Sequence, residues 1–147
     1  MSRLNETKRA YDRLSRTLDE QLRLRKGEAN EIAKLRETLD VAFYLLGWAQ
    51  FEYLVREESI EIVREKARTK LLDQYAWKYL QEGIKAYPVR KRLELIFHLN
   101  QDIRNELNKD YTIRNEAAHN YKSLPGEAKD ISSWLQSLEE LVDKFEH

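Results

Sequence analysis

Apolar residues recur at three- and four-residue steps along most of the chain, which is typical of helices that bury one face. Residues 3–26 carry one such stripe, and Gly27 is a natural stop; the stripe consists of Leu4, Tyr11, Leu14, Leu18 and Leu22. The pattern restarts at Glu28 and predicts a second helix to about Glu57. Its middle, AFYLLGWAQFEYL, is apolar nearly all round, so we expect it to be the most buried element, with Trp48, Phe51 and Tyr53 in the core.

The second half of the chain predicts shorter helices. A third pattern runs from Ile60 to Tyr79, Gly83 and Pro88 mark a break, and residues 89–107 read as a fourth helix. Asp110 or Thr112 is then expected to cap a short helix that carries residues 114–119. The stretch SLPG (123–126) breaks the chain again before a last helix whose stripe, from Ile131 to Phe145, includes Trp134. The pattern therefore predicts an all-α, antiparallel helical bundle in a single domain over residues 1–147.

Composition narrows the class of protein. Four glycines and two prolines in 147 residues argue against a β-rich fold with many turns. The 26 basic and 26 acidic residues cancel, so no overall basic excess indicates nonspecific nucleic-acid binding, although a local patch stays open. There is no cysteine, the N-terminal stretch has no apolar core of a signal peptide, and the longest apolar run, VAFYLLGWA, is too short to span a membrane. We expect a cytoplasmic protein with no membrane contact.

Few residues suggest a metal or cofactor. No HxxxH or HExxH pair occurs, which argues against a helical zinc site, and no cofactor is expected. Asp102 and Glu106, one helical turn apart, could hold Mg²⁺, but in a chain so rich in acids such a pair is more often a solvated edge. His98 lies among apolar residues in LIFHLN and is expected to be a packed, structural histidine.

The stretch RNEAAHNY (114–121) gathers residues that could do chemistry together. The spacing of Arg114, Asn115 and His119 resembles the R-x4–6-H motif of the HEPN superfamily, small all-helical domains common in toxin–antitoxin, phage-defence and RNA-processing systems. Tyr121 is similar to the tyrosine of the extended R-x4-H-x-Y form, found in HEPN toxins paired with small nucleotidyltransferases. GWAQFEYLVRE (47–57) resembles an aromatic-x-x-aromatic-Glu stretch of several HEPN groups, and it contains Glu52.

The resemblance implies a metal-independent endoribonuclease whose site forms across a homodimer. Histidine, with an ordinary pKa of about 6.5, suits removal of a proton from the ribose 2′-OH. Arginine keeps its charge and offers a planar fork of donors to phosphoryl oxygens. Arg114 and His119 are thus the catalytic candidates, Asn115, Tyr121 and Glu52 support them, and the expected partners are RNA, a second copy and an antitoxin or nucleotidyltransferase.

Helical geometry limits how the motif can work. Residues five apart lie about 140° apart around a straight helix, so Arg114 and His119 do not share a face, whereas Asn115 and His119 do. Convergence requires a distortion near the helix start, a long reach by Arg114, or a second copy across a twofold axis. Two alternatives remain open: a catalytically inactive HEPN-like module that binds a nucleotide, RNA or protein, and a plain structural bundle in which Arg114 and His119 make ordinary surface contacts. Two roles are equally open for Glu52. Its side chain faces the same cleft as Arg114 and His119, or it forms a buried ion pair with an arginine.

Overall fold

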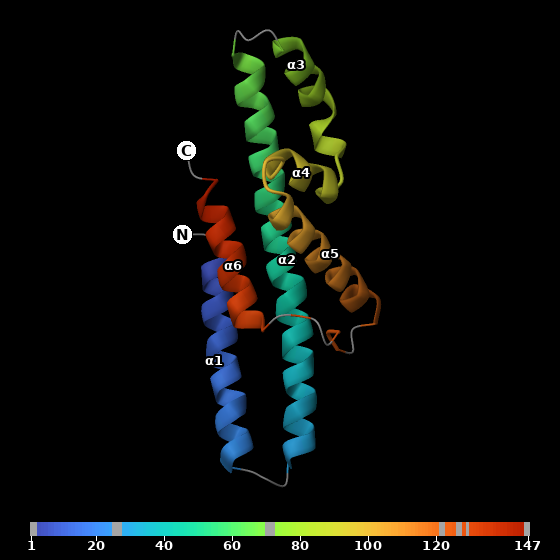
Figure 1. Ribbon diagram of the computed structural model, residues 1–147. Coiled ribbons are helices and arrows are strands. Elements are labelled where there is room, and N and C mark those ends of the chain that lie inside the picture. The colour runs from blue at the N-terminus through green and yellow to red at the C-terminus, as the bar shows by residue number, and fades with distance from the viewer. Residues whose placement is uncertain are drawn as a thin grey trace. The chain divides into compact units, whose positions relative to one another are not determined.

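The computed structural model describes residues 3–24, 28–69, 73–120, 123–125, 128 and 130–145. These residues form six α-helices and a short 3-10 turn, with no strand among them (Figure 1). In chain order the elements are α1 (Arg3–Leu24), α2 (Ala29–Arg68), α3 (Gln74–Gly83), η2 (Ile84–Ala86), α4 (Val89–Ile96), α5 (Gln101–Asn120) and α6 (Ile131–Asp143). The predicted all-α fold is confirmed.

The predicted end of the second helix near Glu57 is wrong. Helix α2 continues for 40 residues to Arg68, so the pattern that starts at Ile60 belongs to the same helix. No glycine or proline occurs from Phe51 to Arg68, and nothing in the local sequence therefore interrupts the helix.

The helix predicted over residues 89–107 is also divided differently. Helix α4 ends at Ile96, and the Asn100 side chain accepts a 3.1 Å hydrogen bond from the backbone N–H of Ile103 at the start of α5. Helix α5 then runs without a break through residues 108–112, so the separate short helix capped by Asp110 or Thr112 is wrong. Asp110 is buried inside α5, where its carboxylate accepts a 3.1 Å hydrogen bond from the indole Nε1 of Trp134.

The chain packs as two compact units, of which the first comprises residues 1–51 and 110–147. Here α1 lies antiparallel to the first part of α2, as two hydrogen bonds show: Thr7 Oγ1 donates to Gln50 Oε1 at 2.7 Å, and Arg36 Nη1 donates to Ser15 Oγ at 2.6 Å. Helix α6 packs against α1. The core includes Trp48, Phe51 and Trp134, as predicted, and further Leu4, Tyr44, Ala117, Ile131, Leu135 and Leu138.

The second unit, residues 52–109, is organised around a buried arginine. The guanidinium of Arg92, whose residue is only 3% exposed, donates to Ser59 Oγ at 2.7 Å and to the backbone carbonyls of Ile84, Lys85 and Tyr87. Burial lowers the pKa of Arg92, the charge of Arg56 lowers it further, and the carboxylates of Glu52 and Glu57 act in the opposite direction. The arginine therefore holds η2 against this stretch of α2 through hydrogen bonds that no apolar side chain would provide.

Several residues that the pattern places inward are exposed. Tyr53, expected in the core, is 61% exposed, and Leu14, Leu22, Leu35 and Leu46 are each 44–49% exposed. His98 is also exposed; its Nδ1 lies 2.9 Å from the carbonyl oxygen of Leu95 in the turn after α4, so the expected packed histidine is wrong. An apolar stripe shows which face a helix can bury, but not how much of that face a neighbour covers.

Candidate functional site

The last two turns of α5 carry the motif residues and are held in a fixed rotation by the first unit's core. Ile113 and Ala117, one turn apart, are 8% and 0% exposed. Asp110, a further turn back, contacts α6 through Trp134 and α2 through its carbonyl, which accepts a 2.8 Å hydrogen bond from the hydroxyl of Tyr44. These anchors determine which side chains of residues 114–119 point away from the core.

Arg114 is half-buried, and its guanidinium is directed along the helix surface. Its Nη1 donates a 3.0 Å hydrogen bond to Oδ1 of the next residue, Asn115, which is also half-buried. Asn115 lies one turn before His119 on the same face. At this spacing the Cβ atoms of the two residues are about 5–6 Å apart. The guanidinium thus reaches around α5 toward the face that carries His119.

His119 is exposed in the last turn of α5. Within the described part of the chain, its imidazole makes no hydrogen bond that would fix its orientation. Helix α5 is uninterrupted through residues 114–119, so the distortion that would turn Arg114 and His119 onto one face does not occur. Of the three routes to convergence, the long reach of Arg114 and a second copy remain.

The supporting residues are placed separately. Glu52 is half-buried and belongs to the second unit, where its charge acts on the guanidinium of Arg92. This Coulombic effect is not the buried ion pair that was one of its two expected roles, so both roles of Glu52 stay predictions. Tyr121 lies outside the described residues.

The candidate magnesium pair behaves as a solvated edge. Asp102 and Glu106 are both exposed, and Glu106 forms an ion pair of 3.5 Å with Lys109. Over the part of the chain that the structure describes, no three histidine, aspartate or glutamate side chains gather where they could hold a metal ion.

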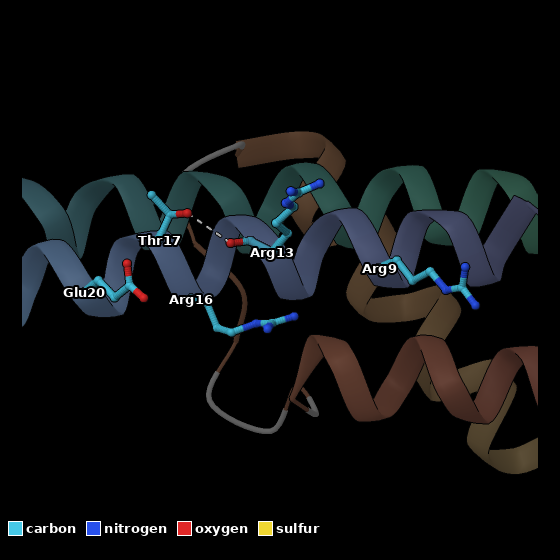
Figure 2. Close-up of a pocket in the computed structure, with 5 residues that line it drawn as sticks. All are labelled: Arg9, Arg13, Arg16, Thr17 and Glu20. Atoms are coloured by element: carbon cyan, nitrogen blue, oxygen red, sulfur yellow. Dashed lines mark hydrogen bonds between the residues drawn. The ribbon is translucent and has the colours of Figure 1, made fainter.

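A second cationic feature, a row of arginines on α1, was missed in the sequence because the charges of the whole chain cancel. Arg9, Arg13 and Arg16 are exposed at steps of four and three residues and line a shallow hollow with Thr17 and Glu20 (Figure 2). In Figure 2, Arg9 and Arg16 extend along one side of α1, and Arg13 projects from the other. The spacing of the three arginines is the feature of the sequence that could have revealed the row.

Two of the four acidic residues of α1 are engaged by other cations. Asp12 pairs with Lys8 at 2.9 Å, and Asp19 pairs with Arg36 of α2. Helix α1 therefore presents more positive than negative charge along the surface that carries Arg9, Arg13 and Arg16.

No helix in the described ranges is long and apolar enough to cross a membrane. Comparisons of the chain with protein-family models, with curated proteins and with solved structures found no match. The arguments about function therefore rest on the residues and the geometry of this chain, together with the motif resemblance.

Proposed function

We propose that the chain is a cytoplasmic endoribonuclease of toxin–antitoxin or phage-defence type, with a composite site built from Arg114 and His119 of two copies. The observation that carries the proposal is the hydrogen bond between Arg114 and Asn115, which draws the guanidinium toward the face of α5 that exposes His119. An antitoxin or a small nucleotidyltransferase is the regulatory partner that the motif resemblance suggests.

Electrostatics at the end of α5 favour two copies over one. The last carbonyls of a helix carry a partial negative charge, which opposes binding of a phosphate nearby. One guanidinium offsets this only in part, whereas a twofold contact brings two guanidinium groups and two imidazoles to one phosphate. The second imidazole also supplies the proton donor that the reaction needs.

The reaction follows from these groups. One His119 removes the proton of the ribose 2′-OH, whose oxygen attacks the adjacent phosphorus. The bond from phosphorus to the 5′ oxygen breaks, and the His119 of the other copy donates a proton to that leaving oxygen. Arg114 stabilises the charge that develops on the phosphoryl oxygens, and Asn115, whose carbonyl accepts from Arg114, keeps its amide N–H groups for the imidazole. The products are a 2′,3′-cyclic phosphate and a 5′-hydroxyl.

The test uses purified protein, a DNA oligonucleotide with one internal ribose, and EDTA. We expect cleavage only after the ribose, with a cyclic phosphate on the 5′ fragment. Loss of one electrostatic donor typically reduces the rate about 10²–10³-fold, so Arg114→Ala should be severely impaired while it retains the helical spectrum of the parent. Cleavage at deoxyribose, or cleavage that EDTA abolishes, would contradict the mechanism.

A second candidate is a catalytically inactive module that binds RNA. The imidazole of His119, which makes no hydrogen bond to a residue that the structure describes, favours this function. The arginine row on α1 also favours it, because Arg9, Arg13 and Arg16 suit binding to phosphates without any cleavage. A salt-dependent affinity for RNA that survives His119→Ala but falls in an Arg9→Ala, Arg13→Ala, Arg16→Ala triple variant, with no cleavage by either protein, would support this function over the first.

A further inference from the structure

One face of the α1–α2 pair in the first unit is apolar and exposed, and the charged Arg13 lies at its edge beside Thr17. Leu14 of α1 is 47% exposed, and Leu35 and Leu46 of α2 are 49% and 44% exposed. We call this surface the uncharged face. It comprises Ala10, Leu14, Thr17, Leu18 and Gln21 of α1, and Leu35, Thr38, Leu39, Ala42, Leu45, Leu46 and Ala49 of α2.

The uncharged face lies opposite the helix that covers the pair. Helix α6 contacts α1 beside Asp12, which Ser132 hydrogen-bonds, and contacts α2 at Tyr44, whose ring stacks on Trp134 with centroids 4.0 Å apart. Residues two apart on a helix project about 160° apart, so Leu14 and Leu46 point away from α6. Figure 1 shows α6 beside only part of the length of α1.

The absence of charge on this face calls for an explanation. Charged residues make up 35% of the sequence, yet none occurs among the twelve side chains that define the face. Exposed helix faces of soluble proteins are normally rich in lysine, glutamate and arginine, and a contiguous apolar patch marks a contact surface. A charge-free face also offers nothing by which a charged partner would be selected.

We propose that a second copy of this chain packs on the uncharged face, so that two α1–α2 pairs form a four-helix contact. A twofold contact requires a surface that is complementary to itself, and here leucines alternate with alanines and threonines along both helices. Leucines of one copy can therefore fill the spaces above Ala42, Thr38 and Thr17 of the other, as in knobs-into-holes packing.

The size of the face fits such a contact. Leu14 to Gln21 and Leu35 to Ala49 span up to 14 residue steps, or about 21 Å of helix, and the pair is two helices or roughly 20 Å wide. The area enclosed by this length and width is within a factor of about two of the ~800 Å² that each partner buries in a standard interface. The contact is distinct from the composite site, because α5 reaches α2 at Tyr44 and Trp48, through Asp110 and Tyr111. A chain that makes both contacts forms a tetramer or a larger assembly.

The first measurement is the mass of the assembly by sedimentation equilibrium. The variant Leu14→Glu/Leu46→Glu should lower the oligomeric state or weaken the assembly by at least about 30-fold, as expected for interface hot spots. The matched control is Leu99→Glu, because Leu99 is 91% exposed and belongs to the second unit, not to the α1–α2 pair that carries the face. Helicity of all proteins is compared by circular dichroism.

The second measurement does not depend on substitutions that weaken the assembly. The sequence has no cysteine, so each single-cysteine variant reports one position. Thr38→Cys should cross-link two copies with a short thiol-specific reagent, and Arg16→Cys, at an exposed position about 160° around α1 from Leu14, should not. A wild-type protein that is monomeric at micromolar concentration, or an assembly that Leu14→Glu/Leu46→Glu leaves unchanged and Thr38→Cys fails to cross-link, would overturn the proposal. Ribonuclease activity in a protein that still dimerises but fails the variant and cross-linking tests would leave the composite site standing, whereas a monomeric wild type would contradict both contacts.

Discussion

The indole Nε1 of Trp134 in α6 donates a 3.1 Å hydrogen bond to the carboxylate of Asp110 in α5, and both residues are buried. The ring of Trp134 also stacks on Tyr44 of α2, whose hydroxyl donates to the backbone carbonyl of Asp110. Burial raises the pKa of Tyr44, and the charge of Asp110 raises it further, so the hydroxyl stays protonated as a donor. Three helices are thus joined at one point, one turn before Arg114.

The first prediction removes only the indole donor. Trp134→Phe should lower the free energy of unfolding by about 1–3 kcal/mol, because it leaves a buried carboxylate with one partner fewer and also removes ring area. Asp110→Asn retains a carbonyl that can accept the same bond and should cost less. Chemical denaturation measures both, and equal losses would contradict the role assigned to the hydrogen bond.

The second prediction concerns the close approach of α2 and α6 at Gly47. A Cβ built on Gly47 would lie 2.5 Å from Cδ2 of Leu135 and 3.1 Å from Cζ3 of Trp134. Gly47→Ala should therefore destabilise the protein by about 1–3 kcal/mol, despite the higher helix propensity of alanine. Gly83→Ala is the matched control, since its Cβ would meet only the Tyr87 ring at an ordinary 3.6 Å. Thermal unfolding of the two variants should separate them clearly, with the control near the wild type.

The sequence could predict properties that depend on neighbouring residues, but not those that depend on how the helices pack. Three- and four-residue periodicity is a local property, and it correctly gave helices and the burial of Trp48 and Trp134. The end of α2 was predicted too early, although no glycine or proline interrupts the helix there. The continuity of α5 through Asp110 was mispredicted because an aspartate caps a helix only if its carboxylate has no better tertiary partner. Asp110 has such a partner in Trp134, and this pairing depends on how α5 and α6 pack.

The candidate site was predictable in its residues but not in its geometry. The spacing of Arg114 and His119 was visible, and their separation around a straight helix was calculable. The hydrogen bond from Arg114 to Asn115 was not, since a long side chain can take many rotamers on a helix surface. The burial of Arg92 was also hidden, because an arginine in VRKRLEL reads as one of several solvated charges.

The third prediction is a pH dependence at the contact between α1 and α6. Burial would raise the pKa of Asp12, but hydrogen bonds from Ser132 and Lys8 outweigh it, and the pKa lies below its ordinary value of 3.8. A lowered pKa in the folded state stabilises the fold above pH 3.8, and this contribution is lost as the pH falls through the folded value. The wild type should exceed Asp12→Asn in unfolding free energy at about pH 6, by less than about 1 kcal/mol because the pair is partly exposed and solvent screens it. The difference should shrink toward about pH 3.

The fourth prediction tests the buried guanidinium of the second unit. Lysine cannot donate to Ser59 Oγ and to the carbonyls of Ile84 and Tyr87 from one ammonium group, so Arg92→Lys should cost about 1–3 kcal/mol. Hydrogen exchange should show lost protection in α3 and η2 before it appears in α1. Arg90→Lys, at an exposed position on the same helix, serves as the control and should behave like the wild type.

The last prediction separates a composite site from a site within one copy. If the site takes Arg114 from one copy and His119 from the other, then Arg114→Ala and His119→Ala proteins should each be inactive alone. Mixed and allowed to exchange subunits, they form heterodimers whose composite site keeps one Arg114 and one His119, each from a different copy. About half of the dimers are mixed at statistical exchange, and each lacks the second imidazole that protonates the leaving oxygen, so the mixture should gain activity over either variant alone but stay well below half of the wild-type value. The control is a mixture of the wild type with the double variant Arg114→Ala/His119→Ala. It measures how much activity the wild type loses when its subunits pair with an inactive copy. Among the residues that the structure describes, the guanidinium of Arg114 bonds to its neighbour Asn115, and His119 is exposed, so neither change should disturb the core that holds α5. Two inactive variants whose mixture stays inactive, although mass spectrometry shows heterodimers, would mean that Arg114 and His119 act within one copy or that both histidines are needed at once. A mixture of Arg114→Ala and Arg114→Ala/His119→Ala contains no intact arginine, must remain inactive under every arrangement, and therefore gives the background of the assay.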